Sequence, residues 1–253
     1  MILLPKPPKV ITKKGNQATL EIEALYPGYG VTIANSLRRV LLSSLPGSAI
    51  TQVKIKGIQH EYSTIPGVTE DVINIIMNLK ELRFKMNSTE PQKATIKIKG
   101  EKDVKGSDIK TSGQVEVINE MAHIATLTSK TAELDMEIQI EKGIGYEPVE
   151  NRKKQGKLEI GTIPVDAIFT PIKRVNYTVD NMRVGDRTDF DKIILDITTD
   201  GTIDPEQAFF ESAKILVDHF SLFVNSFESK DSKKEEPKKE KKEKKKPKTK
   251  KQA

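Results

Sequence analysis

The stretch from Tyr26 to Pro46, YPGYGVTIANSLRRVLLSSLP, constrains the fold more than any other part of the sequence. Gly28 and Gly30 allow a tight turn at its start, and the final proline marks its end. The residues between them predict a helix of about three to four turns, with Thr32 able to cap its start.

The predicted helix has a wider apolar arc than a helix needs in order to sit on one sheet. At about 100° per residue, the arc contains Ile33, Leu37, Val40, Leu41 and Leu45, and Leu42 extends it. We therefore expect two surfaces to cover this helix.

A narrow polar stripe runs along the same helix. Asn35, Arg39 and Ser43 succeed one another at spacing four, and Arg38 lies at the border of the apolar arc. The pattern fits a core helix with two solvated arginines. It also fits a stripe that docks a partner, because arginine suits partly buried ion pairs at interfaces.

Composition excludes several kinds of site. The chain has no cysteine, so neither a disulfide framework nor a thiolate metal site is possible. Its three histidines stand far apart and show no metal-ligand spacing. No apolar run approaches the ~20 residues of a membrane span, and the N-terminus lacks a signal-peptide core. We therefore expect a soluble protein of a reducing compartment.

The net charge of +6 is concentrated at one end of the chain. From Ser229 onward 13 lysines stand against five acidic residues, which gives +8, so residues 1–228 carry −2. A globular domain that holds a nucleic-acid backbone normally carries its own basic face, which argues against nucleic acid as the main partner of the folded part. The tail, residues 229–253, has almost no apolar residue and is expected to be disordered.

Alternating apolar residues predict strands on both sides of the first helix. Residues 17–25 and 49–58 alternate clearly, and residues 82–140 contain several short runs separated by turn residues, as in an antiparallel β-rich unit. Further strands are predicted at residues 165–169, 175–179 and 192–198. The remaining segments suggest an extended arm at residues 1–16, an exposed loop at 142–157 and a connection at 181–190.

Thr69 is expected to cap a short helix that begins near residue 70. Glu70 and Asp71 would then lie in its first turn, where the helix dipole favours carboxylates. The apolar residues of this helix are Val72, Ile73, Ile76 and Leu79.

A second long helix begins at a clear boundary. Asp204 can cap it, Pro205 suits its first position, and Gln207 completes a capping box. A helix-packing seam with alternating spacings of four and three contains Phe209, Ala213, Leu216, Phe220, Phe223 and Phe227. A second apolar line contains Phe210, Val217 and Val224. One line can face the protein's own sheet and the other a partner, although a helix buried within one domain fits the pattern too.

Motifs for catalysis are weak. The sequence Gly28-Tyr29-Gly30 lacks the third glycine of a dinucleotide fingerprint and does not match a phosphate-binding loop. Asp189 and Asp191 lie on one side of an extended segment and could hold magnesium, but the basic residues that flank them favour local ion pairs. We expect no active site on this chain.

Residues 35–47, NSLRRVLLSSLPG, resemble the signature helix of the alpha subunit of bacterial-type RNA polymerase. Other blocks resemble that family and occur in its order. They are HEYST at 60–64, ED at 70–71, NLK at 78–80, RTD at 187–189 and DGTIDPE at 200–206. The resemblance covers roughly residues 17–228.

The resemblance implies an α+β fold with a discontinuous dimerisation domain. Residues 1–46 and 172–228 would form this domain, with two long helices on a mostly antiparallel sheet, and residues 47–171 would form an inserted β-rich domain. The implied dimer interface contains Ile33, Leu37, Leu41, Phe209, Leu216, Phe220, Phe223 and Phe227.

The resemblance also implies an assembly scaffold of DNA-directed RNA polymerase, a homodimer that binds the beta and beta-prime subunits. The implied beta contacts are Arg38, Arg39 and Lys80, with Glu70 and Asp71 nearby. The implied beta-prime contacts are Arg174, Arg183, Arg187 and Asp189. The polymerase active site and its magnesium would lie on the large subunits, with no cofactor on this chain. Bacterial cytoplasm and plastid stroma both suit the family.

The sequence departs from the family at the end of the chain, where a lysine-rich tail stands in place of the usual C-terminal DNA-binding domain. The tail could attract DNA weakly and non-specifically, or be a solvated low-complexity end. The alternative function is therefore an autonomous nucleic-acid-binding protein that acts through the tail.

Overall fold

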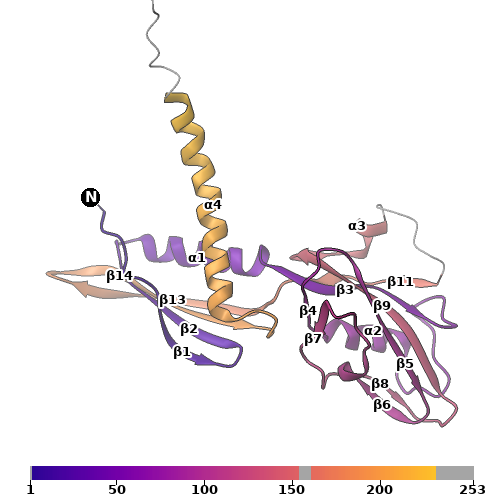
Figure 1. Cartoon of the computed structure of the whole chain (residues 1–253). Coiled ribbons are helices and arrows are strands. Elements are labelled where there is room, and N and C mark those ends of the chain that lie inside the picture. The colour runs from indigo at the N-terminus through magenta and orange to yellow at the C-terminus, as the bar shows by residue number, and fades with distance from the viewer. Residues whose placement is uncertain (1, 154–160, 232–253) are drawn as a thin grey trace, which may run out of the picture. The chain divides into compact units, whose positions relative to one another are not determined.

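The computed structural model describes residues 2–153 and 161–231 and has an α+β fold (Figure 1). Every pairing between its described strands is antiparallel. The chain divides after Leu216 into two units. Most of the lysine-rich tail that the sequence analysis expects to be disordered lies outside the described residues.

A four-stranded sheet joins two distant parts of the chain. Its order is β1 (Lys9–Lys14), β2 (Gln17–Leu25), β14 (Arg187–Thr199) and β13 (Ile172–Val184). Helix α1 (Tyr29–Ser43) lies along one face of this sheet (Figure 1). A shared core includes Leu20 and Ile22 of β2, Ile193 and Leu195 of β14, and Leu41 of α1. The alternation predicted for residues 17–25 is confirmed, with the same bounds.

Two segments expected to lie outside the sheet, the arm at residues 1–16 and the connection at 181–190, contribute strands to it. Residues 9–14 of the arm form β1, an edge strand whose residues are all exposed. Because both of its faces meet solvent, no period of two marks it in the sequence. The expected connection at 181–190 is a hairpin, in which β13 and β14 continue past the core on either side of Gly185.

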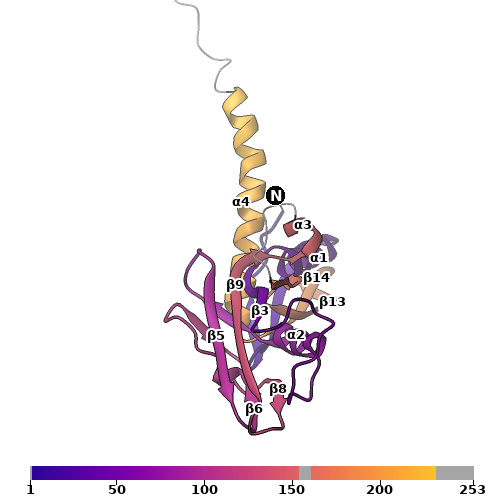
Figure 2. The same cartoon turned by 90° about the vertical axis from the view of Figure 1, so that its right-hand side faces the viewer.

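A second core lies under another four-stranded sheet, in which Figure 2 shows β3, β9 and β5 side by side. Its order is β11 (Thr162–Pro164), β3 (Pro46–Ile55), β9 (Glu133–Ile144) and β5 (Gln92–Lys99). Helix α2 (Val72–Glu81) buries Val72, Ile75 and Leu79 in this core.

Short elements complete this part of the chain. The paired strands are β4 (Phe84–Met86) with β7 (Val115–Val117), β6 (Lys102–Lys105) with β8 (His123–Leu127), and β10 (Tyr146–Glu147) with β12 (Ala167–Ile168). The short helices are η1 (Gly106–Asp108) and α3 (Val149–Lys153). The exposed loop expected from residue 142 is therefore wrong up to residue 153, because β9 continues to Ile144 and is succeeded by β10 and α3; residues 154–157 of that loop lie outside the described ranges.

Two helices begin where the sequence analysis did not place them. Helix α1 begins at Tyr29, and the Thr32 hydroxyl donates to the Gly28 carbonyl (3.3 Å) and caps no amide. Helix α2 begins at Val72 after Asp71, so Thr69 is not its cap. In both cases the residues that precede the helix make hydrogen bonds to distant strands, which a local capping pattern does not reveal.

Helix α4 (Pro205–Asp231) begins as predicted. The Glu206 amide donates to Oδ1 of Asp204 at 3.1 Å, which confirms Asp204 as the cap. The expected capping box is not formed in this described segment: Asp204 accepts the Glu206 amide, and the Gln207 side-chain amide donates to Glu211 (3.0 Å).

The first prediction concerns Gly47, where the chain leaves α1 and enters β3. A Cβ at this position would lie 1.8 Å from the Phe169 carbonyl oxygen. Replacing Gly47 with alanine should therefore lower the free energy of unfolding by at least about 2 kcal/mol. Gly113 is the matched control, because a Cβ there meets nothing within 4 Å. Chemical denaturation should show Gly113→Ala within about 0.5 kcal/mol of wild type, and an equally small effect of Gly47→Ala would contradict this packing.

Candidate docking surface

The outward side of α1 combines basic and apolar residues. Arg38 and Arg39 are both exposed. On the same exposed side, Val31 is 56% and Leu42 is 37% exposed. Positive charge beside exposed aliphatic side chains is suited to a protein partner that offers both acidic and apolar groups.

The buried side of α1 faces the chain's own sheet. Leu37 is 4% exposed and Leu41 is 0% exposed, and both belong to the core of the first sheet. In this chain their side chains are covered by its own sheet, and their expected place in a dimer interface stays a prediction. Ile33 is only partly buried against the same core and keeps an accessible side.

Lys80 lies on a different helix, beside a groove. Its ammonium group is 3.4 Å from Oδ2 of Asp166. The groove between α2 and β11 is lined by Glu61, Tyr62, Ile73, Ile76, Met77, Lys80, Val149, Ile163, Pro164, Val165 and Asp166. Tyr62 and Met77 are 78% and 59% exposed, so the groove offers apolar contact area around one ion pair.

Asp166 connects this groove to the neighbouring loop. The Val149 amide donates to its carboxylate at 3.0 Å, and this bond, with the charge of Lys80, holds the pKa of Asp166 below its usual value. Desolvation and the Asp166 carboxylate raise the pKa of Tyr146. Tyr146 is 60% exposed and pairs in register with Ile168, which is 49% exposed. The sequence analysis assigned no contact to either residue: it placed Tyr146 in the expected loop at 142–157 and Ile168 in the strand predicted at 165–169.

Glu70 faces inward. Its carboxylate is 2.8 Å from Nε2 of His123 and accepts the Thr126 amide at 2.7 Å. Desolvation raises the pKa of Glu70, but the bonds from Thr126 and His123 outweigh it and hold the pKa below its usual value. Glu70 therefore joins the start of α2 to β8, whereas Asp71 is exposed at the residue before the helix. The expected placement of both carboxylates in the first turn is wrong.

Arg187 forms the centre of an aromatic cluster at the β13–β14 hairpin. Its guanidinium donates to both carboxylate oxygens of Asp189, at 3.0 and 2.6 Å. It also lies 5.5 Å from the ring centre of Tyr26 and 5.2 Å from that of Phe190. The bidentate bond to Asp189 raises the pKa of Arg187, and the bond from Arg187 lowers the pKa of Asp189.

The other basic residues expected near this hairpin are exposed. Nε of Arg183 donates to the Gly185 carbonyl at 2.8 Å, which leaves its charge at the tip of the hairpin. Arg174 is exposed near the start of β13, at the opposite end of this strand from the tip of the hairpin. The structure therefore brings Arg183, Arg187 and Asp189 to one end of the hairpin and places Arg174 elsewhere on the same strand.

Asp189 and Asp191 do not act as a pair. Asp189 binds Arg187, as the local ion-pair interpretation predicts. Asp191 is 8% exposed and accepts the amides of Gly28 and Gly30, both at 2.9 Å. The predicted local ion pair is therefore confirmed for Asp189. It is wrong for Asp191, which accepts two backbone amides instead.

The second half of α4 is exposed on two sides. Phe220, Phe223 and Phe227 are 61%, 59% and 67% exposed. Phe220 and Phe223 make an edge-to-face contact with ring centres 6.4 Å apart. Leu222, which points away from these rings at about 100° per residue, is 67% exposed. In the first half of the helix, Phe209 and Leu216 pack against the core of the first sheet.

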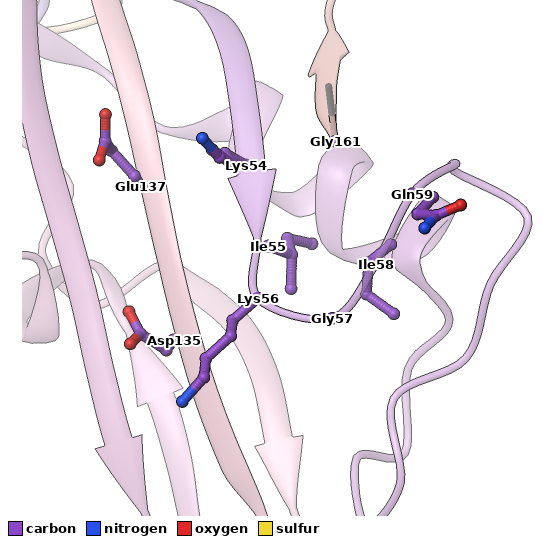
Figure 3. Close-up of a pocket in the computed structure, with 9 residues that line it drawn as sticks. All are labelled: Lys54, Ile55, Lys56, Gly57, Ile58, Gln59, Asp135, Glu137 and Gly161. Carbon is purple, nitrogen blue, oxygen red and sulfur yellow. The ribbon is translucent and has the colours of Figure 1, made fainter. Parts of the chain in front are cut away.

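The hollow at the end of β3 offers no catalytic set. Figure 3 shows Lys54 and Lys56 beside Asp135 and Glu137, from neighbouring strands. These carboxylates pair with lysines of β5, at 3.3 Å for Lys97–Asp135 and 2.6 Å for Lys93–Glu137. Within residues 2–153 and 161–231, no group of three histidine or acidic side chains could hold a metal, and no helix is long and apolar enough to cross a membrane.

Comparison with known proteins identifies relatives along most of the chain. Residues 53–170 match the family model described as the RNA polymerase Rpb3/RpoA insert domain. The chain is 47% identical over 222 residues to a DNA-directed RNA polymerase subunit alpha of Symbiobacterium thermophilum, covering 88% of this chain and 70% of that protein. It is 51% identical over 211 residues to the protein of the same name in Clostridium beijerinckii, covering 83% of this chain and 66% of that protein.

The second prediction concerns the inward-facing Glu70. Replacing it with glutamine should lower the free energy of unfolding by about 1 kcal/mol at pH 7, because charge-assisted hydrogen bonds are lost. The folded-state pKa of Glu70 lies below its ordinary value of 4.5. Its stabilising effect is therefore present above pH 4.5 and is lost as the pH falls through the folded-state pKa.

Chemical denaturation of wild type and Glu70→Gln, measured from pH 7 to below pH 4.5, tests the prediction. The stability difference should close below pH 4.5. The exposed Glu116, replaced by glutamine, is the control and should stay within about 0.5 kcal/mol throughout. A difference between wild type and Glu70→Gln that does not change with pH would show that the Glu70 charge has no stabilising role.

Proposed function

Because the chain belongs to the family of DNA-directed RNA polymerase alpha subunits, we propose that its role in this enzyme is that of an assembly scaffold. Two copies form a homodimer, and the beta and beta-prime subunits assemble on it. The observation that carries the docking half of the proposal is the exposed side of α1, where Arg38 and Arg39 accompany Val31 and Leu42.

The beta subunit docks on α1 and beside α2. Exposed arginine suits an interface because its planar guanidinium binds carboxylates through two hydrogen bonds and is weakly hydrated. Leu42 and Val31 supply apolar area next to that charge. The groove that contains Lys80 and Met77 extends the available contact area. Glu70 has a structural role in this proposal, since its carboxylate already binds Thr126 and His123.

The beta-prime subunit docks at the β13–β14 hairpin. Arg183 is exposed at its tip, and the Arg187–Asp189 pair beside it is held against Tyr26 and Phe190. A charged pair fixed by aromatic contacts keeps its geometry in the free protein, which reduces the entropy lost on binding. Arg174 contributes from the start of the same strand.

The homodimer forms through the second half of α4. A monomer would leave Phe220, Phe223 and Phe227 more than half exposed, and monomeric soluble proteins rarely expose so large an apolar stripe. Phe209, Leu216 and Ile33 contribute only their remaining accessible area, because each is partly buried in the chain's own core. Catalysis and its magnesium belong to the large subunits, in the bacterial cytoplasm.

The third prediction separates docking from core packing. Replacing the exposed Arg39 with alanine should leave the fold and the dimer intact, because its side chain faces away from the core. It should weaken beta binding by about 2–5 kcal/mol, since a charge-assisted contact is lost and a partner group is left unpaired. That loss is a fall in affinity of about 30- to 5,000-fold.

Three measurements on this variant decide between docking and packing. They are the melting temperature, the mass of the dimer and the affinity for purified beta subunit. Lys110→Ala, at an exposed position away from α1, is the matched loss of positive charge and should leave beta binding unchanged. Wild-type affinity in Arg39→Ala would remove this residue from the docking surface, and a collapsed fold would make it structural.

The fourth prediction concerns the dimer. Replacing Phe220 with glutamate should bury an unpaired charge in the proposed helix seam and give monomer or aggregate. Ser221→Glu adds the same charge one residue away, outside the seam, and should remain dimeric. Light scattering at several concentrations measures the mass. A stable wild-type monomer, or a fully dimeric Phe220→Glu, would exclude this interface.

A further inference from the structure

Helix α1 has no local N-cap. Its N-cap residue is Gly28, which has no side chain, and no side chain of the helix's own first turn bonds to its first amides. The amides of Gly28 and Gly30 instead donate to a single atom, Oδ2 of Asp191, at 2.9 Å each. Asp191 belongs to β14, 161 residues from Gly30 along the chain. This buried carboxylate supplies the negative charge that the start of a helix favours.

The two glycines fit this contact for different reasons. Gly28 has φ +85°, a left-handed conformation that other residues adopt at a cost. At Gly30, a Cβ would lie 2.6 Å from Cγ1 of Val179 and 2.9 Å from Oδ2 of Asp191. The Gly-Tyr-Gly sequence thus leaves room for a carboxylate to reach two backbone amides. It binds the chain's own Asp191 in the way that glycine-rich helix starts bind anions.

Asp191 also lies next to the second proposed docking site. Two residues earlier on β14, Asp189 holds Arg187, which in turn packs against Tyr26, two residues before Gly28. Tyr26 and Phe190 make an edge-to-face contact with ring centres 6.2 Å apart. One end of α1 is therefore attached to the β13–β14 hairpin through Asp191 and through the aromatic cluster.

We propose that Asp191 is a positioning residue for the docking surface of α1. By holding the first turn of the helix against β14, it sets the direction in which α1 presents Arg38 and Arg39. Asp191 itself is buried, so it acts through the helix that it holds. The inference rests on the proposed docking role of α1, and it adds a residue that the resemblance to the family did not include among the contacts.

The test compares Asp191→Ala with Asp191→Asn in the full-length dimer. Alanine removes both hydrogen bonds, whereas asparagine keeps an oxygen that can accept them and is an equally good capping residue. Hydrogen exchange by mass spectrometry in peptides that cover residues 26–34 should accelerate about 10-fold in Asp191→Ala. Affinity for purified beta subunit should fall by about 10-fold, and Asp191→Asn should restore both within about threefold.

Asp196→Ala is the matched control on the same strand. Its half-buried carboxylate accepts the Thr19 hydroxyl at 2.5 Å and does not contact α1. It should lower the melting temperature without changing exchange at residues 26–34 or beta affinity. If Asp191→Ala does not fold, Asp191→Ser replaces it, since its side chain is one bond too short to reach both amides.

A double variant tests whether Asp191 acts through the arginines. Adding Asp191→Ala to Arg39→Ala should cost less beta affinity than Asp191→Ala costs alone, because the contact that it positions is already lost. Full additivity, or faster exchange with unchanged beta affinity, would overturn the positioning role. In another outcome, Arg39→Ala leaves beta affinity unchanged while Asp191→Ala still accelerates exchange at residues 26–34. That result would overturn the docking proposal and support only the capping contact.

Discussion

The pairing of β2 with β14 is the constraint on which the rest of the structure depends. Leu20 lies opposite Leu195 and Ala18 opposite Ile197, so segments about 175 residues apart share one hydrophobic face. The part of the chain between residues 47 and 169 must therefore begin and end beside this sheet. The chain leaves through Gly47 and returns through Phe169, and these residues are so close that a Cβ at Gly47 would overlap the Phe169 carbonyl. A long-range pairing of this kind is costly in chain entropy and needs a continuous apolar face to form.

The sequence was a good guide wherever one face of a strand is buried. Alternating residues located β2, most of β9 and the inner part of β14, because a half-buried strand leaves a period of two. It was a poor guide at the edges. The residues of β1 are all exposed, and the outer part of the β13–β14 hairpin is held by backbone hydrogen bonds with little burial, so neither carries a hydrophobic period.

Helix starts show a second limit of local patterns. The cap of α4 could be predicted because Asp204 lies next to the amide that it binds. The start of α1 could not, because Asp191 comes from a strand more than 160 residues away. Glu70 shows the same limit for the docking surface. Its position in a family motif does not reveal that its carboxylate accepts the amide of Thr126, on a strand 56 residues away. Whether a charged side chain is exposed depends on tertiary packing, which cannot be read from the sequence around it.

The second half of α4 has large apolar side chains that a single chain leaves exposed. A helical segment of this length is marginal in water without packing, and burial of each large apolar side chain contributes about 1.5–3 kcal/mol. Phe220 and Phe223 contact each other along the helix, which covers only part of each ring. Leu222 lies on the opposite side, so a single helix seam with a second copy would still leave it exposed. The arrangement that buries all these side chains encloses this part of the helix from two sides. A dimer in which each copy contributes more than one element meets that requirement, whereas two helices packed along one line do not.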